Sequence, residues 1–421
     1  MAEKHLKVVH VSTYPTFGGA AIAALRLHNA LLSEGAESAM LVQQIEREEA
    51  KVVGFATDFW ARKWAFVRFA AERLYFALQA KNKEVHFHFS PLWTGVNISS
   101  HPLIQAADVI HLHWINFGFL SLKSLEQLFS LGKPVVWTMH DMSTFTGGCH
   151  YSRHCDHYLS HCHHCPYLRQ PTAQDLSFRV FGQKKKLFKN ANLTLVSPSE
   201  WLAQLAQRAV STQHLKTFAI PNLIDTNAFQ PADKQEAKKK WGLNIKKKWL
   251  LFAGVNTQDP RKGFAYFKEA THLLSDKKED WGIVVFGKTQ PKDTENLGLE
   301  VISLGSIAAQ KVIGVYQAAD VMVVPSLEDN YPNTVIEAMA CGTPVVGFHT
   351  GGISEQIIHL KTGYVADLYS STDLAKGIQF VLDNPDYEQL SRANRTLIEN
   401  RNAVGVVTKK MIDLYKTFFP K

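Results

Sequence analysis

The sequence predicts an α/β protein built from two doubly wound domains, each with a parallel sheet of the Rossmann-like kind. Short, almost continuously apolar runs alternate with helical stretches along the chain, as expected of strands that helices cover on both faces. The alternation occurs twice, on either side of a segment rich in Pro, Asn and Asp. The length of 421 residues fits this division, because domains of about 150 residues would give two or three of them.

The elements of both halves can be placed from these patterns. In the first half we expect strands at 6–12, 38–43, 107–114, 134–140 and 193–199, and helices at 20–34, 121–131 and 200–209. In the second half we expect strands at 249–255, 282–287, 301–305, 321–326 and 344–348, and helices near 262–275, 308–319 and 334–341. The region 387–419 is expected to be helical.

The predicted domains are residues 1–215 and 216–400. A helix over 401–421 is expected to follow them and to pack back on the first domain. The segment TFAIPNLIDTNAFQP, at 217–231, is interpreted as the linker because of its Pro, Asn and Asp content.

Composition limits the class of protein. With 46% hydrophobic and 20% charged residues, the chain is neither disordered, nor collagen-like, nor a small disulfide scaffold. Its formal charge of +8 allows an acidic small molecule, an anionic membrane surface or a nucleic acid as partner, without choosing among them. The lysine runs at 238–240 and 246–248 are interpreted as a solvated helix face and a turn.

The apolar runs of the chain predict a cytoplasmic protein. The start MAEKHLKVVHVS lacks the apolar region of a signal peptide, and no run reaches the roughly 18 to 20 apolar residues of a membrane span. Residues 58–81 combine aromatic and basic side chains in a helical pattern. Two interpretations of this segment stay open: a helix at an anionic membrane face, and an ordinary amphipathic helix packed on its domain.

Candidate site residues follow the strands, because ligands of open parallel sheets bind beyond the carboxyl ends of the strands. Gly18 and Gly19 end the loop after the first strand, at the start of a helix. Arg261 and Lys262 stand before Gly263, where another helix is expected to start. Two cations and unpaired helix N–H groups could hold a diphosphate without a metal. The alternatives are a plain turn and an exposed basic pair.

The densest stretch of candidate residues runs from 325 to 352. Asp329 and Glu337 are eight positions apart, and Thr334 lies where a helix should begin and could bind a phosphate. Glu337, one turn further, could accept the two hydroxyls of a ribose. A second glycine turn follows at 350–352. Buried carboxylates and such a turn could also be structural.

These residues make the chain resemble the retaining glycosyltransferases of family 4, which have the GT-B fold. The resemblance extends over nearly the whole chain and rests on the N-terminal glycine loop, the linker motif IPN-x-x-D, the RKG turn, the E-x7-E segment and the C-terminal helix. Within that family the chain looks most like bacterial polysaccharide-building members with a WTMHD…TGGCHY segment.

The resemblance implies two domains facing a central cleft, and transfer of a sugar from a nucleotide-sugar with retention at the anomeric carbon. It implies that Lys262 contacts the donor diphosphate, that Glu337 binds the ribose, and that Asp329 touches donor-sugar hydroxyls. His140 would stand near the donor sugar. Gly18 and Gly19 would border the donor phosphate and the acceptor.

The chain departs from the family pattern at several positions. Asp329 replaces a Glu, Val255 stands where Arg is common, and Leu223 replaces a Gly of the linker motif. Arg261 is therefore expected to supply the second positive charge. Pro332 lacks the N–H that a Gly offers there. The donors in its place are expected from neighbouring residues, namely Asn330, Tyr331, Asn333 and Thr334.

The expected chemistry needs no metal cofactor, because no DxD-like motif follows a strand. Arg261, Lys262 and helix N-termini would stabilise the leaving UDP or GDP. Attack from the same face would need no protein nucleophile, and His140 would position the sugar, through its backbone carbonyl for example. The expected acceptor is a saccharide or lipid-linked saccharide in lipopolysaccharide or capsule synthesis. The enzyme could then lie peripherally at the inner face of the plasma membrane through residues 58–81.

Four of the five cysteines lie in one segment, with the spacing Cys149-x5-Cys155-x6-Cys162-x2-Cys165. A Cys-x2-Cys pair with two further thiols is typical of a structural zinc site, and an iron–sulfur cluster also takes four thiolates. Reduced thiols and redox-active disulfides are the alternatives. Because the segment follows His140, a metal would stiffen one wall of the cleft without taking part in the reaction.

Two functions other than sugar transfer are alternatives for this sequence. One is a further GT-B enzyme, a sugar-nucleotide epimerase or a phosphorylase. The other is a zinc-dependent nucleic-acid-binding protein, suggested by the charge and the Cys/His cluster. That cluster fits no C2H2 finger and the lysine runs lack interleaved aromatics, so no nucleic-acid partner is expected.

Overall fold

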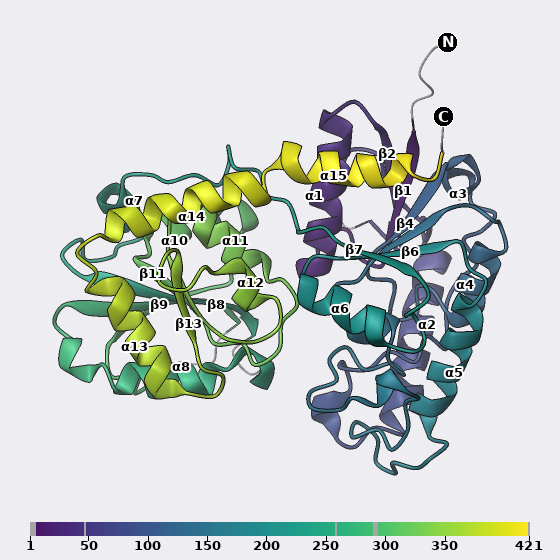
Figure 1. Cartoon of the computed structure of the whole chain (residues 1–421), viewed down its shortest axis with the longest axis horizontal. Coiled ribbons are helices and arrows are strands. Elements are labelled where there is room, and N and C mark those ends of the chain that lie inside the picture. The colour runs from purple at the N-terminus through teal and green to yellow at the C-terminus, as the bar shows by residue number, and fades with distance from the viewer. Residues whose placement is uncertain (1–5, 46–47, 257–258, 289–293, 420–421) are drawn as a thin grey trace. The chain divides into compact units, whose positions relative to one another are not determined.

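The computed structural model describes residues 6–45, 48–256, 259–288 and 294–419. The chain divides into two compact units. The first unit comprises Met1–Pro221 and Thr408–Lys421, and the second comprises Asn222–Val407. The sequence placed the corresponding boundaries at 215/216 and 400/401. Figure 1 labels most helices and strands of each unit.

The first unit contains a seven-stranded parallel sheet in the order β3-β2-β1-β4-β5-β6-β7. Its strands are β1 (Lys7–Ser12), β2 (Glu37–Val42), β3 (Val52–Gly54), β4 (Val109–Leu112), β5 (Val135–Thr138), β6 (Leu193–Ser197) and β7 (Lys216–Ala219). Its helices are α1 (Gly19–Ser33), α2 (Phe59–Ala77), α3 (Pro102–Ala106), α4 (Leu122–Phe129), α5 (Leu176–Phe188) and α6 (Glu200–Arg208). The short 3-10 turns are η1 (Lys83–Val85), η2 (Met142–Thr144) and η3 (His157–Leu159).

The second unit contains a six-stranded parallel sheet in the order β10-β9-β8-β11-β12-β13. Its strands are β8 (Lys248–Asn256), β9 (Trp281–Lys288), β10 (Glu300–Gly305), β11 (Val321–Val324), β12 (Val345–Phe348) and β13 (Gly363–Ala366). Its helices are α7 (Lys234–Lys240), α8 (Phe264–His272), α10 (Ala309–Ala318), α11 (Asn333–Ala340), α12 (Ile353–Gln356), α13 (Ser371–Leu382) and α14 (Tyr387–Arg401), and α15 (Val404–Lys416) begins in it. The short turns are η4 (Pro260–Lys262) and η5 (Ser275–Lys277).

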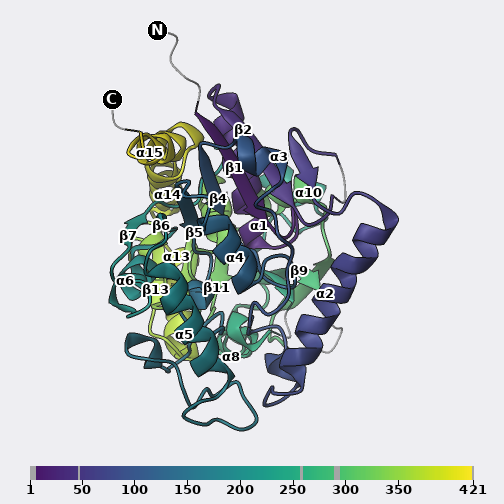
Figure 2. The ribbon, with the colours of Figure 1, turned by 90° about the vertical axis from the view of Figure 1, so that its right-hand side faces the viewer.

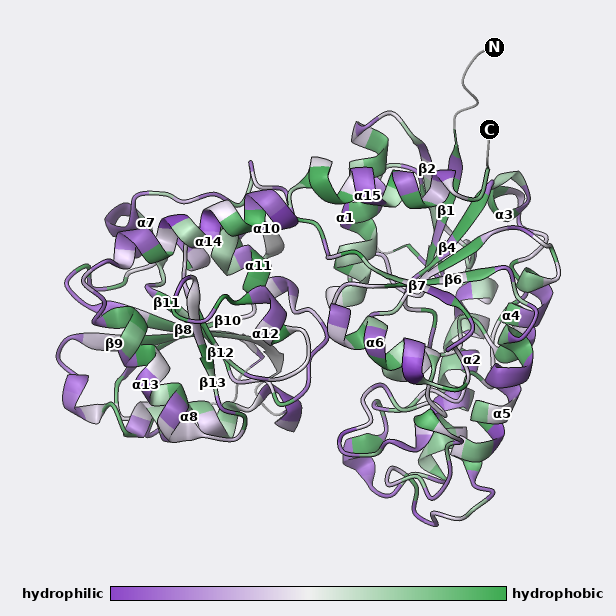
Figure 3. Cartoon of the chain, viewed as in Figure 1, coloured by the Kyte–Doolittle hydropathy of each residue, from purple (hydrophilic) through white to green (hydrophobic). Residues whose placement is uncertain are grey.

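The cores of both units lie where the sequence places its apolar runs. All residues of β4, β5, β11 and β12 are buried, because helices cover both faces of the central strands. Figure 3 shows the strands mostly in the colour of hydrophobic residues. The predicted fold class, parallel α/β with two Rossmann-like sheets, is confirmed. Among the described residues, no helix has the length and apolar character needed to cross a bilayer.

Several local interpretations of the sequence were wrong. The predicted linker contains β7, an edge strand whose residues alternate between exposed and half-buried, so it lacks the apolar run of a central strand. The region 387–419 is helical, as expected, and forms two helices separated at Asn402 and Ala403. Lys238 does not lie on a solvated helix face: it is only 6% exposed, and its Nζ lies 2.8 Å from Asp320 Oδ2.

The C-terminal segment belongs to the first unit. Tyr415, on the part of α15 that lies there, is fully buried, and its hydroxyl is 2.6 Å from His111 Nδ1 on β4. A buried Tyr bonded to a central strand anchors the end of the chain.

Candidate functional site

The turn after β8 requires glycine at its end. Gly263 follows η4 with φ of 65°, in the left-handed region, and α8 begins at the next residue. A Cβ atom here would lie 1.8 Å from the carbonyl oxygen of Pro325, which follows β11. Because only glycine fits this approach, Arg261 and Lys262 are held directly against the loop after β11. The amide of Leu327 strengthens the contact by donating to the Arg261 carbonyl at 2.7 Å.

Both cations of this turn have carboxylate partners. Arg261 Nη2 lies 2.7 Å from Asp259 Oδ2, a pairing within one turn that was not expected from the sequence. Lys262 Nζ lies 2.6 Å from Asp329 Oδ2. The structure therefore brings together two predicted site residues that are 67 positions apart. The neighbouring Arg261 guanidinium helps to hold the pKa of Asp259 below its usual value, against the opposing effect of burial.

The second glycine turn meets the same place. Gly351 has φ of 53°, and a Cβ atom on it would lie 1.9 Å from the carbonyl oxygen of Asp329. The amide of Gly352 donates to that carbonyl at 3.2 Å, and the hydroxyl of Thr350 donates to Leu327 at 2.9 Å. The loops after β8, β11 and β12 thus converge at the carboxyl edge of the sheet.

Glu337 lies on α11 and is 8% exposed. Its Oε2 accepts a hydrogen bond from the hydroxyl of Tyr316, at 2.8 Å. Tyr316 is fully buried on α10, so it fixes the carboxylate in one orientation. Tyr316 could not be identified from the sequence, because nothing in its local pattern separates it from an ordinary core aromatic residue.

The residues predicted to provide hydrogen-bond donors surround the start of α11. The Tyr331 hydroxyl accepts from Asn402 Nδ2 at 3.1 Å, and Asn333 Oδ1 accepts from Asn222 Nδ2 at 2.9 Å. Asn330 is 2% exposed and Thr334 is half-buried. Pro332 occupies the N-cap, and no side chain caps the first turn of α11. The side chains of Tyr331 and Asn333 thus connect the start of α11 to Asn402 and Asn222, which lie near the two ends of the second unit in the sequence.

In the first unit, four histidines form a connected cluster, called here the histidine cluster: His10, His111, His113 and His140. His10 Nδ1 lies 3.0 Å from His113 Nε2, and His113 Nδ1 lies 3.2 Å from His140 Nε2. Burial lowers the pKa of His111 to about 3 and that of His140 to about 4, so these rings are neutral at neutral pH. Burial also lowers the pKa of the other two well below the usual value.

Hydrogen bonds to neighbouring side chains keep the histidine cluster in place. The ligand atoms of His10, His111 and His113 lie within 4.8 Å of one another. Both ring nitrogens of His111 are engaged, with the Tyr415 hydroxyl at 2.6 Å and with Thr138 Oγ1 at 2.7 Å. The arrangement fixes the His113 ring against His140. Of these four residues only His140 was expected at the site, although the HLH pattern at 111–113, at the end of a buried strand, is a visible signal in the sequence.

The predicted glycine loop lies at the start of α1. Gly18 is the N-cap residue, with φ of 87°, and Gly19 is the first residue of the helix. The space where a Gly18 side chain would stand contains no atom within 4 Å among the described residues. The loop therefore presents an open backbone at a helix N-terminus, which suits an anionic ligand.

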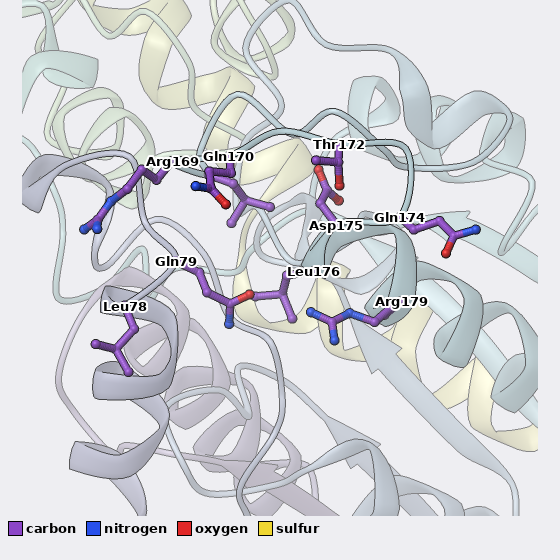
Figure 4. A pocket seen from close by; sticks show the side chains of 10 residues that line it. Leu78, Gln79, Arg169, Gln170, Thr172, Gln174, Asp175, Leu176 and Arg179 are labelled. Atoms are coloured by element: carbon purple, nitrogen blue, oxygen red, sulfur yellow. The ribbon is translucent and has the colours of Figure 1, made fainter.

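A cavity of the first unit contains none of the predicted residues. It has a volume of about 340 Å³ and lies between the end of α2 and the start of α5 (Figure 4). Its wall includes Arg169, Arg179 and Asp175. A second, much smaller cavity is lined by all four cysteines of residues 149–165, called here the cysteine loop. These thiols are free.

Comparison with known proteins identifies the second unit. Residues 233–398 match the family model of the glycosyl transferases group 1. The chain carries a group 1 glycosyl transferase domain. The resemblance predicted from the sequence is confirmed at this level.

Curated relatives carry names of the same class. The D-inositol 3-phosphate glycosyltransferase of Pseudarthrobacter chlorophenolicus is 28% identical over 289 residues, 66% of this chain and 63% of that protein. The chain therefore spans less than two thirds of that relative. The putative colanic acid biosynthesis glycosyl transferase WcaC of Escherichia coli K12 is 26% identical over 425 residues, 96% of each chain.

Solved structures share the fold over the whole chain. Sucrose-phosphate synthase from Thermosynechococcus elongatus has a TM-score of 0.70 and 19% identity, with 99% of each chain covered. HepE from Anabaena, crystallised with UDP, has a TM-score of 0.65 and 15% identity, with 98% of this chain and 100% of that chain covered. The GT-B fold expected from the sequence is confirmed.

Proposed function

We propose that the protein is a retaining glycosyltransferase that moves a sugar from a UDP- or GDP-sugar to a saccharide or lipid-linked acceptor. The observation that carries the proposal is the convergence of three loops on the ion pair of Lys262 and Asp329. Each loop follows a strand of the second sheet, where doubly wound domains bind nucleotides. A diphosphate that displaces Asp329 from Lys262 would find a cation already placed beside it.

The neighbouring groups suit the rest of a nucleotide-sugar. Glu337, oriented by Tyr316, would accept the two ribose hydroxyls. The first turn of α11 would offer backbone N–H groups to a phosphate oxygen. Asp329, released from Lys262, would accept hydroxyls of the transferred sugar. HepE has also been crystallised with UDP-glucose, which makes this sugar nucleotide the first donor to test.

The proposed chemistry is substitution with attack from the face of the leaving group. The bond between the anomeric carbon and the diphosphate oxygen breaks, and a bond to the acceptor oxygen forms. The acceptor proton passes to the leaving phosphate. Lys262 and Arg261 would stabilise the charge that develops on the diphosphate, and no protein nucleophile is needed. Neutral His140, held by His113, would position the sugar.

A donor screen tests the proposal. Release of nucleoside diphosphate is measured for UDP- and GDP-sugars with saccharide acceptors, and product stereochemistry is read by NMR. Wild type should release diphosphate only with an acceptor, with retention and without sensitivity to EDTA. Glu337→Ala should abolish release, whereas Glu279→Ala, at an exposed position of the same unit, should leave it unchanged. Epimer formation from the donor alone would refute transfer.

The surface of α2 supports an acceptor at a membrane. Phe59, Trp60, Trp64 and Phe66 are each between 61% and 67% exposed. Lys63 Nζ lies 4.4 Å from the centre of the Phe59 ring, and the helix has no acidic residue before its buried Glu72. Figure 2 shows α2 along the outer edge of its unit. An exposed aromatic and basic helix is suited to an anionic lipid surface. The name of WcaC places that relative in polysaccharide synthesis.

Vesicle sedimentation tests the membrane part separately. The protein should sediment with vesicles rich in phosphatidylglycerol and stay in solution with phosphatidylcholine vesicles. Trp60→Ser with Trp64→Ser should lose most of the binding, and Phe218→Ser, at an exposed aromatic position on β7, should retain it. Equal sedimentation of both variants would show that α2 is not the membrane contact.

A further inference from the structure

The cysteine loop lies in a long connection with little regular structure. Between the end of β5 and the start of α5, the described chain forms only the short turns η2 and η3. Connections of this length without helices or strands are uncommon in compact domains unless something holds them. Its two ends are fastened: Cys149 forms an isolated bridge with Phe89, and Leu168 forms one with Ala80. The part between these bridges contains three of the four cysteines.

The four loop cysteines surround one small cavity. It measures about 20 Å³, which is room for a single ion or water molecule. Cys149, Cys162 and Cys165 are at most 9% exposed, and the amide of Gly147 donates to Cys162 Sγ at 3.2 Å. No three of the sulfur atoms lie within 4.8 Å of one another. A tetrahedral zinc–thiolate site needs them about 3.8 Å apart, so binding would draw the loop inward.

A buried lysine on α5, Lys184, also points to a negatively charged site at the cysteine loop. It is 1% exposed, and its Nζ donates to the carbonyl oxygens of Ser143 and Thr146. No carboxylate of the described residues forms an ion pair with it. The Thr146 carbonyl that it binds precedes Gly147, whose amide donates to Cys162 Sγ. The charge of Lys184 interacts with Cys149, Cys162 and Asp141. A buried ammonium group with no carboxylate in direct contact is unfavourable, and this one bonds the segment that leads into the cysteine loop.

We propose that the four loop cysteines bind one structural Zn²⁺, and that the ammonium group of Lys184 offsets the negative charge of the site. Four thiols form four Zn–S bonds and release four protons. The resulting centre carries two negative charges, because four thiolates outweigh the divalent ion by two. Lys184 reduces this excess to one. In the metal-free state the same ammonium group is bonded to two carbonyl oxygens, and the charge of Asp141 is the carboxylate charge that favours it.

Zinc is favoured by the closed set of four soft ligands, which leaves no open position for a substrate. The ion would also fix the wall of the large cavity. Asp175, which lines that cavity, accepts from the amide of Cys165 at 2.8 Å and caps α5 through Phe178. Zinc at Cys165 would thus hold the entrance of α5, the helix that carries Lys184.

Metal analysis of untagged protein tests the site without any activity. Mass spectrometry of wild type should find about one zinc per chain. Cys162→Ser with Cys165→Ser should lose the zinc, whereas Cys341→Ala, at the buried fifth cysteine in the second unit, should keep it. On unmodified protein, a chelator should make the half-buried Cys155 reactive to alkylation. Folded wild type without metal, iron with acid-labile sulfide, or a disulfide within the loop would each overturn the proposal.

The role of Lys184 has its own variant. Lys184→Met keeps the length of the side chain and removes the charge. Loss of a group that supports metal ligands typically lowers affinity 10- to 100-fold, so zinc should pass to a competing chelator at 10- to 100-fold lower chelator concentration. Lys185→Met, at the exposed neighbour, should behave as wild type. Equal zinc retention by the two variants would show that Lys184 does not balance the site.

Discussion

Replacing Glu337 by Gln separates the role of this residue in ligand binding from its role in the fold. The Glu337 side chain is 8% exposed and its Oε2 accepts from the buried Tyr316 hydroxyl at 2.8 Å. Gln has the same shape and an amide oxygen that can accept the same hydrogen bond. The variant therefore keeps the contact within the unit and loses only the charge.

The magnitude follows from the hydrogen bonds that the charge would make. A hydrogen bond to a charged group contributes about 1.5–3 kcal/mol, and one between neutral groups about 0.5–1.5 kcal/mol. If Glu337 accepts two ribose hydroxyls, the loss of charge weakens both bonds, by roughly 2–3 kcal/mol together. The dissociation constant of the nucleoside diphosphate should therefore rise about 30- to 150-fold.

Stability and binding should respond differently in a matched set of variants. Glu337→Ala leaves the Tyr316 hydroxyl buried without its acceptor, which should lower the free energy of unfolding by about 1–3 kcal/mol. Glu337→Gln should lower it by less than about 1 kcal/mol. Urea unfolding measures stability, and calorimetric titration with UDP or GDP measures binding. Nucleotide affinity of Glu337→Gln within about twofold of wild type would refute the assignment of the ribose to this carboxylate.

Three further predictions concern the turn, the ion pair and the histidine cluster. Gly263→Ala places a Cβ atom 1.8 Å from the Pro325 carbonyl, so it should lower the free energy of unfolding by more than about 2 kcal/mol. Gly242 also has a positive φ, of 69°, but a Cβ atom there would have no atom within 4 Å among the described residues. Gly242→Ala should therefore lower the free energy of unfolding by only about 1 kcal/mol. Equal urea midpoints of the two variants would contradict this difference. Asp329→Asn removes the carboxylate partner of Lys262. Because a partly exposed ion pair contributes at most about 1 kcal/mol, this variant should bind free nucleoside diphosphate up to about fivefold more tightly. Weaker binding in calorimetry would contradict this. Acidification should destabilise the first unit, because its folded histidine cluster has pKa values below the ordinary 6.5 and the unfolded chain takes up protons that the folded one does not. The contribution of the neutral rings to the free energy of unfolding is present above about pH 6.5 and is lost as the pH falls toward about 4. Urea unfolding of the wild-type protein should therefore have a lower midpoint at pH 5 than at pH 7, and an unchanged midpoint would contradict this.

Most strands that could be predicted from sequence lie in runs of buried residues, whereas the edge strand β10 was predicted although none of its residues is buried. Each expected run overlaps a strand of the structure. The missed strands β3, β7 and β13 are short, with three or four residues each. In β7 and β13 half-buried or exposed positions interrupt the apolar pattern. A strand of that kind is specified by its neighbour in the sheet, which the local sequence does not contain.

The site shows the same division between local and tertiary information. Lys262, Asp329 and Glu337 could be named because the position after a strand predicts a ligand-facing loop. Tyr316 and Asn402 could not, since their roles depend on which helix packs beside α11. The misread Lys238 belongs to the same class. Its burial follows from pairing with Asp320, a residue that lies far along the chain.

The ion pairs of the second unit bear on how the proposed reaction would be accelerated. Arg261 is held by Asp259 and Lys262 by Asp329, so a bound diphosphate would exchange partners with carboxylates. For Lys262, the favourable energy of binding a ground-state diphosphate is reduced by the lost contact with Asp329. As the glycosidic bond breaks, negative charge on the leaving oxygen grows and the new contact strengthens, while the energy of the lost one stays constant. Because the lost contact costs the same in both states, it weakens binding of the donor without lowering the barrier from the bound state. The contact between Lys262 and the leaving oxygen, which strengthens as the bond breaks, is what would favour the transition state and raise the rate.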